Sequence, residues 1–170
     1  MSVLGELQPN KVFKYFEEIC SIPHGSRNLQ QISDYLVDFA KAHELKYRQD
    51  EDLNVIIWKD GSKGYEASEP VILQGHMDMV AVKETDCDKD MEKEGLDLEI
   101  NGDYISAKGT SLGGDDGIAV AYTLAVLDDE EMAHPPIEAI FTVNEEIGML
   151  GAATIDVSDL KGRLFMNMDS

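Results

Sequence analysis

The chain has 170 residues, 43% hydrophobic and 7% aromatic, which suits one globular domain with a core and excludes a disordered chain. Its 14 basic and 34 acidic residues give a formal charge of -20, which argues against nucleic acid or an anionic membrane as a partner. Cys20 and Cys87 lie far apart, the N-terminus has no signal-peptide pattern, and no apolar run has membrane-spanning length. We therefore expect a cytoplasmic protein without disulfides.

Two amphipathic helices are predicted first. Asn10 is a candidate N-cap for the first helix, whose apolar residues follow a helical period until Pro23 ends it. Ser26 is expected to open the second helix, because apolar residues recur on one helical face from Leu29 to His43.

Apolar runs bounded by turn residues predict the strands. The predicted strands are residues 54–58, 71–76, 104–107, 137–143 and 164–168. A short Gly-rich helix is expected at 148–154. Strands separated by helices predict an α/β fold, with a mixed, largely parallel sheet and helices on both faces.

Residues 83–102 are polar and acidic, and we expect them to form an exposed excursion. A calcium loop is the functional alternative, but the segment lacks the spacing and the ending that such a loop requires.

A glycine-rich turn at 109–117 leads into the run 118–127, which is apolar on nearly every side and predicts a buried helix. Asp115 and Asp116 therefore stand where the chain enters the interior, and burying a carboxylate is costly without a cation or strong donors. Two interpretations stay open: one aspartate caps the helix while the other faces water, or one of them holds a metal.

Potential metal ligands follow the apolar strands, and sites in open α/β sheets form outside the carboxyl ends of strands. The residues concerned are His76, Asp78, Glu145, Glu146 and Asp169. Taken singly they are typical of a structural histidine, an acidic surface turn and a solvated end of a strand that ought itself to be buried. Their convergence favours a metal site, in which Asp78 can orient His76 and one of the two adjacent glutamates can remain unligated to handle protons.

Four segments in this order, 71–80, 109–118, 142–149 and 167–170, resemble the two-zinc exopeptidases. The likeness is closest to the aminoacylhistidine dipeptidases (Xaa-His, carnosinase-like), which residues 19–24 also resemble. The resemblance implies a zinc-exopeptidase-like catalytic domain that hydrolyses Xaa-His and related dipeptides. It also implies two zinc ions, with cobalt or manganese as substitutes.

The resemblance assigns metal binding to His76, Asp115, Glu146 and Asp169. In this scheme Asp115 bridges both ions, Asp78 orients the imidazole of His76, and Glu145 is the general base that takes a proton from the activated water. Asp116 is only the neighbour of the bridging residue, and no step depends on it.

Two departures from the family pattern concern the extent of the chain. The family completes its second metal with a histidine near the end of a much longer chain, and it carries a lid or dimerisation domain. We therefore expect residues 1–170 to be the N-terminal part of a single metallopeptidase catalytic domain, inactive alone, from a parent that forms a homodimer. The final residues, which resemble a strand with its ending cut away, agree with this expectation.

Other functions remain as alternatives. A tripeptidase, an aminopeptidase or an N-acyl amino acid deacylase would use the same metal chemistry on another substrate. A non-catalytic acidic module for calcium or magnesium is a different class, and His76 argues against it because hard cations prefer oxygen ligands. A magnesium-dependent phosphoryl-transfer enzyme is a third, but the glycine-rich turn lacks the lysine of a P-loop.

Overall fold

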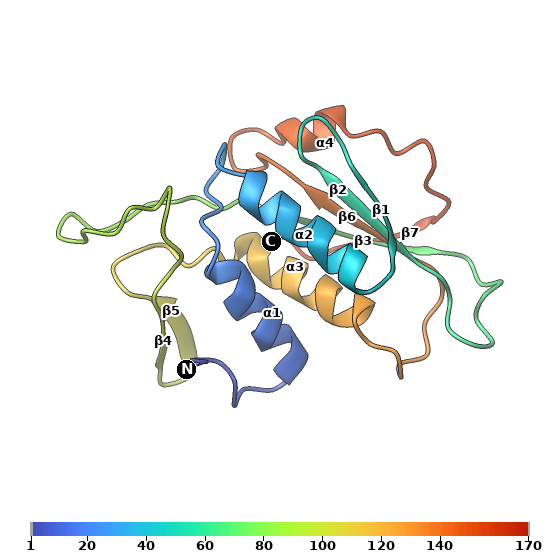
Figure 1. Ribbon diagram of the computed structural model, residues 1–170, viewed down its shortest axis with the longest axis horizontal. Helices are drawn as coiled ribbons and strands as arrows, with labels where there is room; N and C mark the ends of the chain where they lie inside the picture. The colour runs from blue at the N-terminus through green and yellow to red at the C-terminus, as the bar shows by residue number, and fades with distance from the viewer. Residues whose placement is uncertain (1, 170) are drawn as a thin grey trace.

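The computed structural model of the chain describes residues 2–169 and contains a five-stranded sheet in the order β1-β2-β6-β3-β7 (Figure 1). The strands are β1 (Lys46–Gln49), β2 (Val55–Lys59), β3 (Val71–His76), β6 (Ile137–Thr142) and β7 (Leu164–Asn167). Strands β1, β6, β3 and β7 run in one direction, and β2 is antiparallel to both of its neighbours. The predicted mixed, largely parallel sheet is confirmed.

Helices cover the sheet unevenly. They are α1 (Asn10–Cys20), α2 (Gln30–Ala42), α3 (Gly114–Leu127) and α4 (Leu150–Thr154). Helices α1, α2 and α3 lie on one side of the sheet, with α3 packed against β3 and α1, whereas the short α4 lies on the other side (Figure 1). The predicted buried helix is α3, whose apolar residues are mostly inaccessible to solvent.

Strand β6 is buried along its whole length because both of its faces are covered. Ala139 and Phe141 belong to the main core beneath α1, α2 and α3. On the opposite face, the Glu138 carboxylate accepts main-chain N–H bonds from Lys161 and Gly162, so the connection from α4 to β7 covers this face. The site described below lies at the carboxyl end of this well-packed central strand.

Two predicted helix starts are wrong. Pro9 occupies the N-cap position of α1, and the side-chain amide of Asn10 instead donates to the Gly5 carbonyl at 2.8 Å. Helix α2 begins at Gln30 rather than after Ser26, because the Ser26 hydroxyl donates to the carboxylate of Asp78 at 2.7 Å. A distant tertiary partner therefore replaces the local capping bond that the sequence suggested.

The prediction missed two strands, β1 and β4 (Leu98–Asn101). Both are short, and neither shows an apolar run, because β1 is polar apart from Tyr47 and β4 alternates apolar and polar residues. Strand β4 pairs with the predicted β5 (Tyr104–Ala107) in a two-stranded hairpin, which shortens the expected excursion at 83–102 to its irregular first part. Both cysteines are free, and no helix in the described chain is long and apolar enough to span a bilayer.

The last strand, β7, lies at the edge of the sheet, and among the described residues it pairs with β3 alone. Leu164, Phe165 and Met166 are 60%, 55% and 49% exposed. The expectation that this strand is buried is therefore wrong in this structure, because apolar composition alone does not supply the neighbour that would cover an edge.

Candidate metal centre

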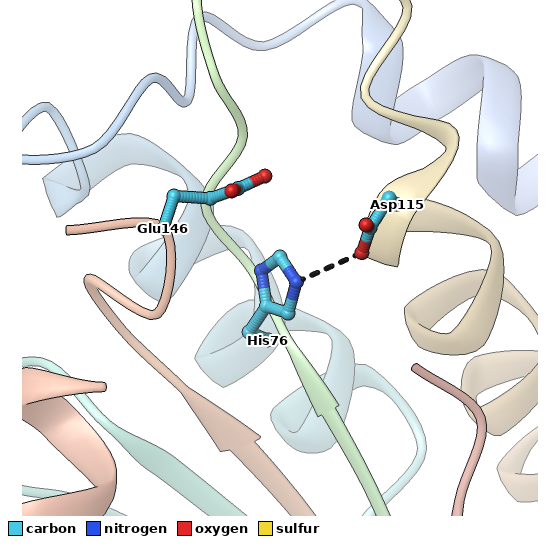
Figure 2. A group of neighbouring side chains, drawn as sticks. All are labelled: His76, Asp115 and Glu146. Atoms are coloured by element: carbon cyan, nitrogen blue, oxygen red, sulfur yellow. Dashed lines mark hydrogen bonds and ion pairs between the residues drawn. The ribbon is translucent and has the colours of Figure 1, made fainter. Parts of the chain in front are cut away.

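The candidate site lies where the carboxyl ends of β3 and β6 meet the N-terminus of α3. In the parallel register His76 at the end of β3 is paired with Thr142 at the end of β6. The turn after β6 carries Glu145 and Glu146, so the chain brings these side chains to the same edge of the sheet. Figure 2 shows His76, Asp115 and Glu146 facing one another from β3, the mouth of α3 and this turn.

Three of the predicted ligands come together. His76, Asp115 and Glu146 each offer one ligand atom, and these atoms all lie within 4.8 Å of one another. His76 Nε2 is 3.1 Å from Asp115 Oδ1 (Figure 2). Donor atoms bound to one zinc ion at about 2.0–2.2 Å lie within about 4 Å of each other, so small side-chain movements suffice to form such a shell. An imidazole with two carboxylates is a donor set that fits a divalent transition-metal ion.

His76 is buried, and its two ring nitrogens have different partners. Nδ1 is 2.9 Å from the main-chain carbonyl oxygen of Asp78, which can only accept, so Nδ1 carries the proton and donates. Nε2 faces Asp115, with Glu145 Oε2 at 3.9 Å. Burial lowers the pKa of His76, but Asp78 and Asp115 outweigh this effect and raise the pKa to about 9. The surroundings thus favour a positive charge here, which a proton or a metal ion can supply.

Asp78 connects three segments around His76. Its carboxylate accepts the Ser26 hydroxyl at 2.7 Å and the main-chain N–H of Glu145 at 3.0 Å. Burial alone would raise the pKa of Asp78, but the nearby His76 ring and the hydrogen bonds from Glu145 and Ser26 lower it. The imidazole is nearer to the Asp78 carbonyl than to its carboxylate, which lies 3.5 Å from Nδ1. Asp78 therefore orients His76 through its main chain and holds the turn after β6 through its side chain.

The turn after β6 presents both glutamates. Asn144 has a φ of 53°, and its side-chain oxygen accepts the main-chain N–H of Arg27 at 2.8 Å, which ties the turn to the segment before α2. Burial, together with the negative charges of Asp115 and Glu145, raises the pKa of Glu146. Glu146 belongs to the group of three, while Glu145 lies beside it at the edge of His76.

The two aspartates at the N-terminus of α3 point in different directions. Gly113 adopts a φ of 68°, the peptide bond between Asp115 and Asp116 is cis, and both aspartates have non-helical dihedral angles. The Asp115 side chain is 54% exposed and faces the site, whereas Asp116 is 1% exposed. Neither caps the helix through its side chain, so the capping interpretation is wrong.

Asp116 is the residue that sequence reasoning missed. Its Oδ2 accepts the main-chain N–H of His76 at 3.1 Å, and burial, aided by the charges of Asp169 and Asp115, raises its pKa to about 6. The available signal was Gly75, since a Cβ at that position would lie 2.9 Å from Asp116 Oδ2. Glycine within a strand can mark such a close approach.

Asp169 is not brought into the group of three. It is exposed and follows β7 at the same edge of the sheet, near enough for its charge to affect Asp116. The structure thus gathers His76, Asp115 and Glu146, places Asp78 and Glu145 against His76, and leaves Asp169 at the periphery.

Known proteins resemble this chain in sequence and in fold. No family model matches the chain. It is 39% identical over all 170 residues to the cytosol non-specific dipeptidase of Escherichia coli (strain K12), of which it covers 35%. The crystal structure of aminoacylhistidine dipeptidase from Vibrio alginolyticus matches 98% of the chain with a TM-score of 0.95 and 40% identity, over 34% of that protein. A tripeptidase from Staphylococcus aureus shares the fold at a TM-score of 0.78 and 23% identity, covering 98% of the chain and 44% of its own length.

The chain spans about a third of the length of the two dipeptidases that it matches. The match extends along essentially all of its residues, so it includes every segment that carried the resemblance in the sequence. By sequence and by fold, the chain is similar to these two dipeptidases, so the resemblance noted in the sequence is confirmed.

Proposed function

We propose that these residues are the N-terminal part of a single metallopeptidase catalytic domain, within a protein that hydrolyses Xaa-His and related dipeptides. The observation that carries this proposal is the group of His76, Asp115 and Glu146, with ligand atoms within 4.8 Å of one another at the carboxyl edge of the sheet. The names of the two similar dipeptidases support the substrate class.

The proposed cofactor is a pair of zinc ions, with cobalt or manganese as substitutes. The imidazole of His76 favours a transition metal over calcium or magnesium. Asp115 directs one carboxylate oxygen toward His76, and we assign it as the residue that both ions would share. We assign His76 and Asp169 to the first ion and Glu146 to the second.

The ions, when bound, supply a water of lowered pKa and polarise the scissile carbonyl. Glu145 is the proposed general base, because its carboxylate lies beside the ligand group and its main chain is anchored by Asp78. It takes a proton from the water and returns it to the leaving amine. Asp78 binds both the His76 ring and the main chain of Glu145, and so fixes the position of the metal ligand relative to the base.

The other parts of the proposal concern the whole protein. The remaining ligand to the second ion and the lid or dimerisation domain would come from residues outside this chain, so the 170 residues alone are expected to be inactive. A homodimer in the cytoplasm is the proposed assembly and location, in agreement with the word cytosol in the name of the Escherichia coli relative.

Substitution of Glu145 tests the proposal. In the full-length protein, zinc content per chain and turnover of Xaa-His dipeptides, tripeptides and N-acyl amino acids are measured for the unmodified enzyme and for Glu145→Gln. We expect zinc content to be retained and kcat to fall by about 10²–10⁴. Glu130→Gln, an exposed acid near the other end of α3, is the matched control.

Each alternative has its own outcome. Unchanged turnover in Glu145→Gln would remove this residue from the role of base. Turnover of tripeptides or N-acyl amino acids alone would identify a different member of the superfamily. Binding of calcium but not zinc, without hydrolysis, would point to a non-catalytic module.

A further inference from the structure

Asp116 is a fully buried carboxylate beside the metal-binding group that has no role in the proposed chemistry. Only 1% of its surface is exposed, and it does not cap α3. It follows Asp115 directly in the chain, yet its side chain points to the main chain of β3 rather than to the site. Burying a carboxylate costs free energy unless hydrogen bonds or a cation compensate for the lost hydration.

At the end of β3, the Asp116 carboxylate takes the place of a hydrogen-bond partner from β7. The ladder between β3 and β7 ends at the pair Gln74 and Asn167, two residues before His76. The main-chain N–H of His76 therefore lies beyond the last β7 partner, and Asp116 Oδ2 accepts it at 3.1 Å. The Asp116 side chain at the N-terminus of α3 thus takes the place of a strand partner at His76, the proposed metal ligand at the end of β3.

The neighbouring glycine makes this contact possible. An ideal Cβ on Gly75 would lie 2.9 Å from Asp116 Oδ2 and 3.1 Å from the Cβ of Ala119. Both distances are too short for an ordinary contact, so a larger residue at 75 would push β3 and the start of α3 apart. The two elements that carry His76 and Asp115 therefore approach each other closely at Gly75 and Asp116.

We propose that Asp116 is a positioning residue for the metal centre. Its carboxylate links the main chain of His76 to the turn that bears Asp115, and so maintains the 3.1 Å spacing of the two ligand atoms. Its negative charge, buried where solvent screens little, adds to the attraction for a cation without occupying a coordination position. This inference rests on the proposed function, since it assigns Asp116 to the same metal site.

The test compares metal affinity with fold stability in the full-length protein. Zinc dissociation constants are measured by competition with a chelating dye, and melting temperatures are measured for the metal-free protein. Asp116→Asn keeps the shape and an acceptor oxygen but removes the charge, so we expect zinc to bind about tenfold more weakly with little change in the metal-free melting temperature. Asp116→Ala also loses the hydrogen bond, and we expect a loss approaching about 100-fold.

A charge control separates this effect from the general loss of one negative charge. Asp38→Asn removes an exposed carboxylate that pairs with Lys41 on the surface of α2. We expect its zinc affinity to equal that of the unmodified protein. An equal weakening in Asp38→Asn and Asp116→Asn would overturn the positioning role.

A double-mutant cycle tests the contact itself. Gly75→Ala should weaken zinc binding strongly when Asp116 is present, because the new methyl group meets the carboxylate. The same change should cost much less in the Asp116→Ala background, while the contact with Ala119 is common to both backgrounds and cancels. Additive effects of the two substitutions would overturn the proposal.

The remaining outcomes also decide the matter. Lower melting temperatures for the Asp116 variants with unchanged zinc affinity, or failure of Asp116→Asn to fold without metal, would show a purely structural role and overturn the inference. Equal zinc affinity in all Asp116 variants of a protein that hydrolyses dipeptides would overturn this inference alone. An unmodified protein that binds no zinc would overturn the proposed function, and the inference with it.

Discussion

Helix α3 carries two adjacent aspartates at each end, and the two pairs have opposite surroundings. At its C-terminal end, Asp128 lies 3.4 Å from Lys11 and 3.5 Å from His43, and Asp129 lies 3.6 Å from Lys11. Lys59 donates to the carbonyl oxygens of Val126 and Asp129 at the same end. Here the chain itself supplies the cations that a helix C-terminus and its acids require.

At the N-terminal end, the charged side chains near Asp115 and Asp116 are mostly further acids. Glu145, Glu146 and Asp78 line the same edge of the sheet, and His76 is the one basic side chain close to Asp115 among the described residues. Identical dipeptides on one helix thus form a closed ion-pair network at one end and an excess of carboxylates at the other. The excess is what makes an external cation the natural partner of the N-terminal pair.

The largest expected difference between the two ends is in metal affinity. Asp115→Ala removes a proposed ligand, so we expect zinc affinity in the full-length protein to fall by more than about 100-fold, beyond the loss typical of outer-shell changes. Asp128→Ala is the matched control at the other end and should retain zinc. Chelator competition measures both, and equal losses would contradict the distinction between the two pairs.

The next largest effect is expected from Lys59. Lys59→Met keeps an apolar stem of similar length but removes two charge-assisted hydrogen bonds at the end of α3, so we expect a loss of about 2 kcal/mol in the free energy of unfolding. Urea denaturation measures the change, with the exposed Lys63→Met as control. Zinc affinity should not change, and a parallel loss of metal binding would show that the two ends are coupled.

Removing one acid from each end of α3 should have opposite effects on the free energy of unfolding of the metal-free protein. The raised pKa of Glu146 means that its charge is unfavourable there, so Glu146→Gln should stabilise the metal-free protein, by no more than about 1 kcal/mol for a partly exposed group. Asp128→Asn should destabilise it by a similar amount, because it weakens the pair with Lys11. Urea denaturation without and with zinc provides the comparison. Destabilisation by Glu146→Gln in the absence of metal would contradict the account of excess carboxylates.

The smallest expected effect is a pH dependence at the C-terminal end. Main-chain N–H bonds from Met132 and Glu131 lower the pKa of Asp129. A lowered folded-state pKa contributes stability above the unfolded value of about 4, and this contribution is lost as the pH falls through the folded value. The unmodified protein should therefore be more stable than Asp129→Asn at pH 6. This difference in stability should disappear below pH 4. A difference that persists at pH 2.5 would show that the carboxylate charge is not its cause.

Local patterns were sufficient for the elements whose residues carry their own signal. Strands β3 and β5 have the predicted bounds, and the all-apolar run after the glycine-rich turn is the buried helix α3. These segments were recognisable because burial of an apolar run and the turn chemistry at its ends are encoded by adjacent residues. The predicted ends of β2, β6 and β7 differ from the structure by one residue, so the same signals located these strands without fixing their last residues.

Features that depend on distant partners were not predictable in this way. Ser26 has the composition of a helix cap but binds Asp78, 52 residues away. Strand β1 has no apolar signature and is defined by its pairing with β2, while β7 has a strong apolar signature and lies exposed at the sheet edge. In each case a contact between remote segments, or the lack of one in the described chain, decides the outcome.

The sequence by itself determined the kinds of residue that end the strands and the order in which they occur, and with them the family resemblance. Only the tertiary structure decided that Asp115 faces the ligand group while Asp116 turns inward to the main chain of His76. The physical reason is that adjacent residues at a helix mouth share one local sequence signal. Their side chains take different directions only when β3, with Gly75 at its surface, is packed against them.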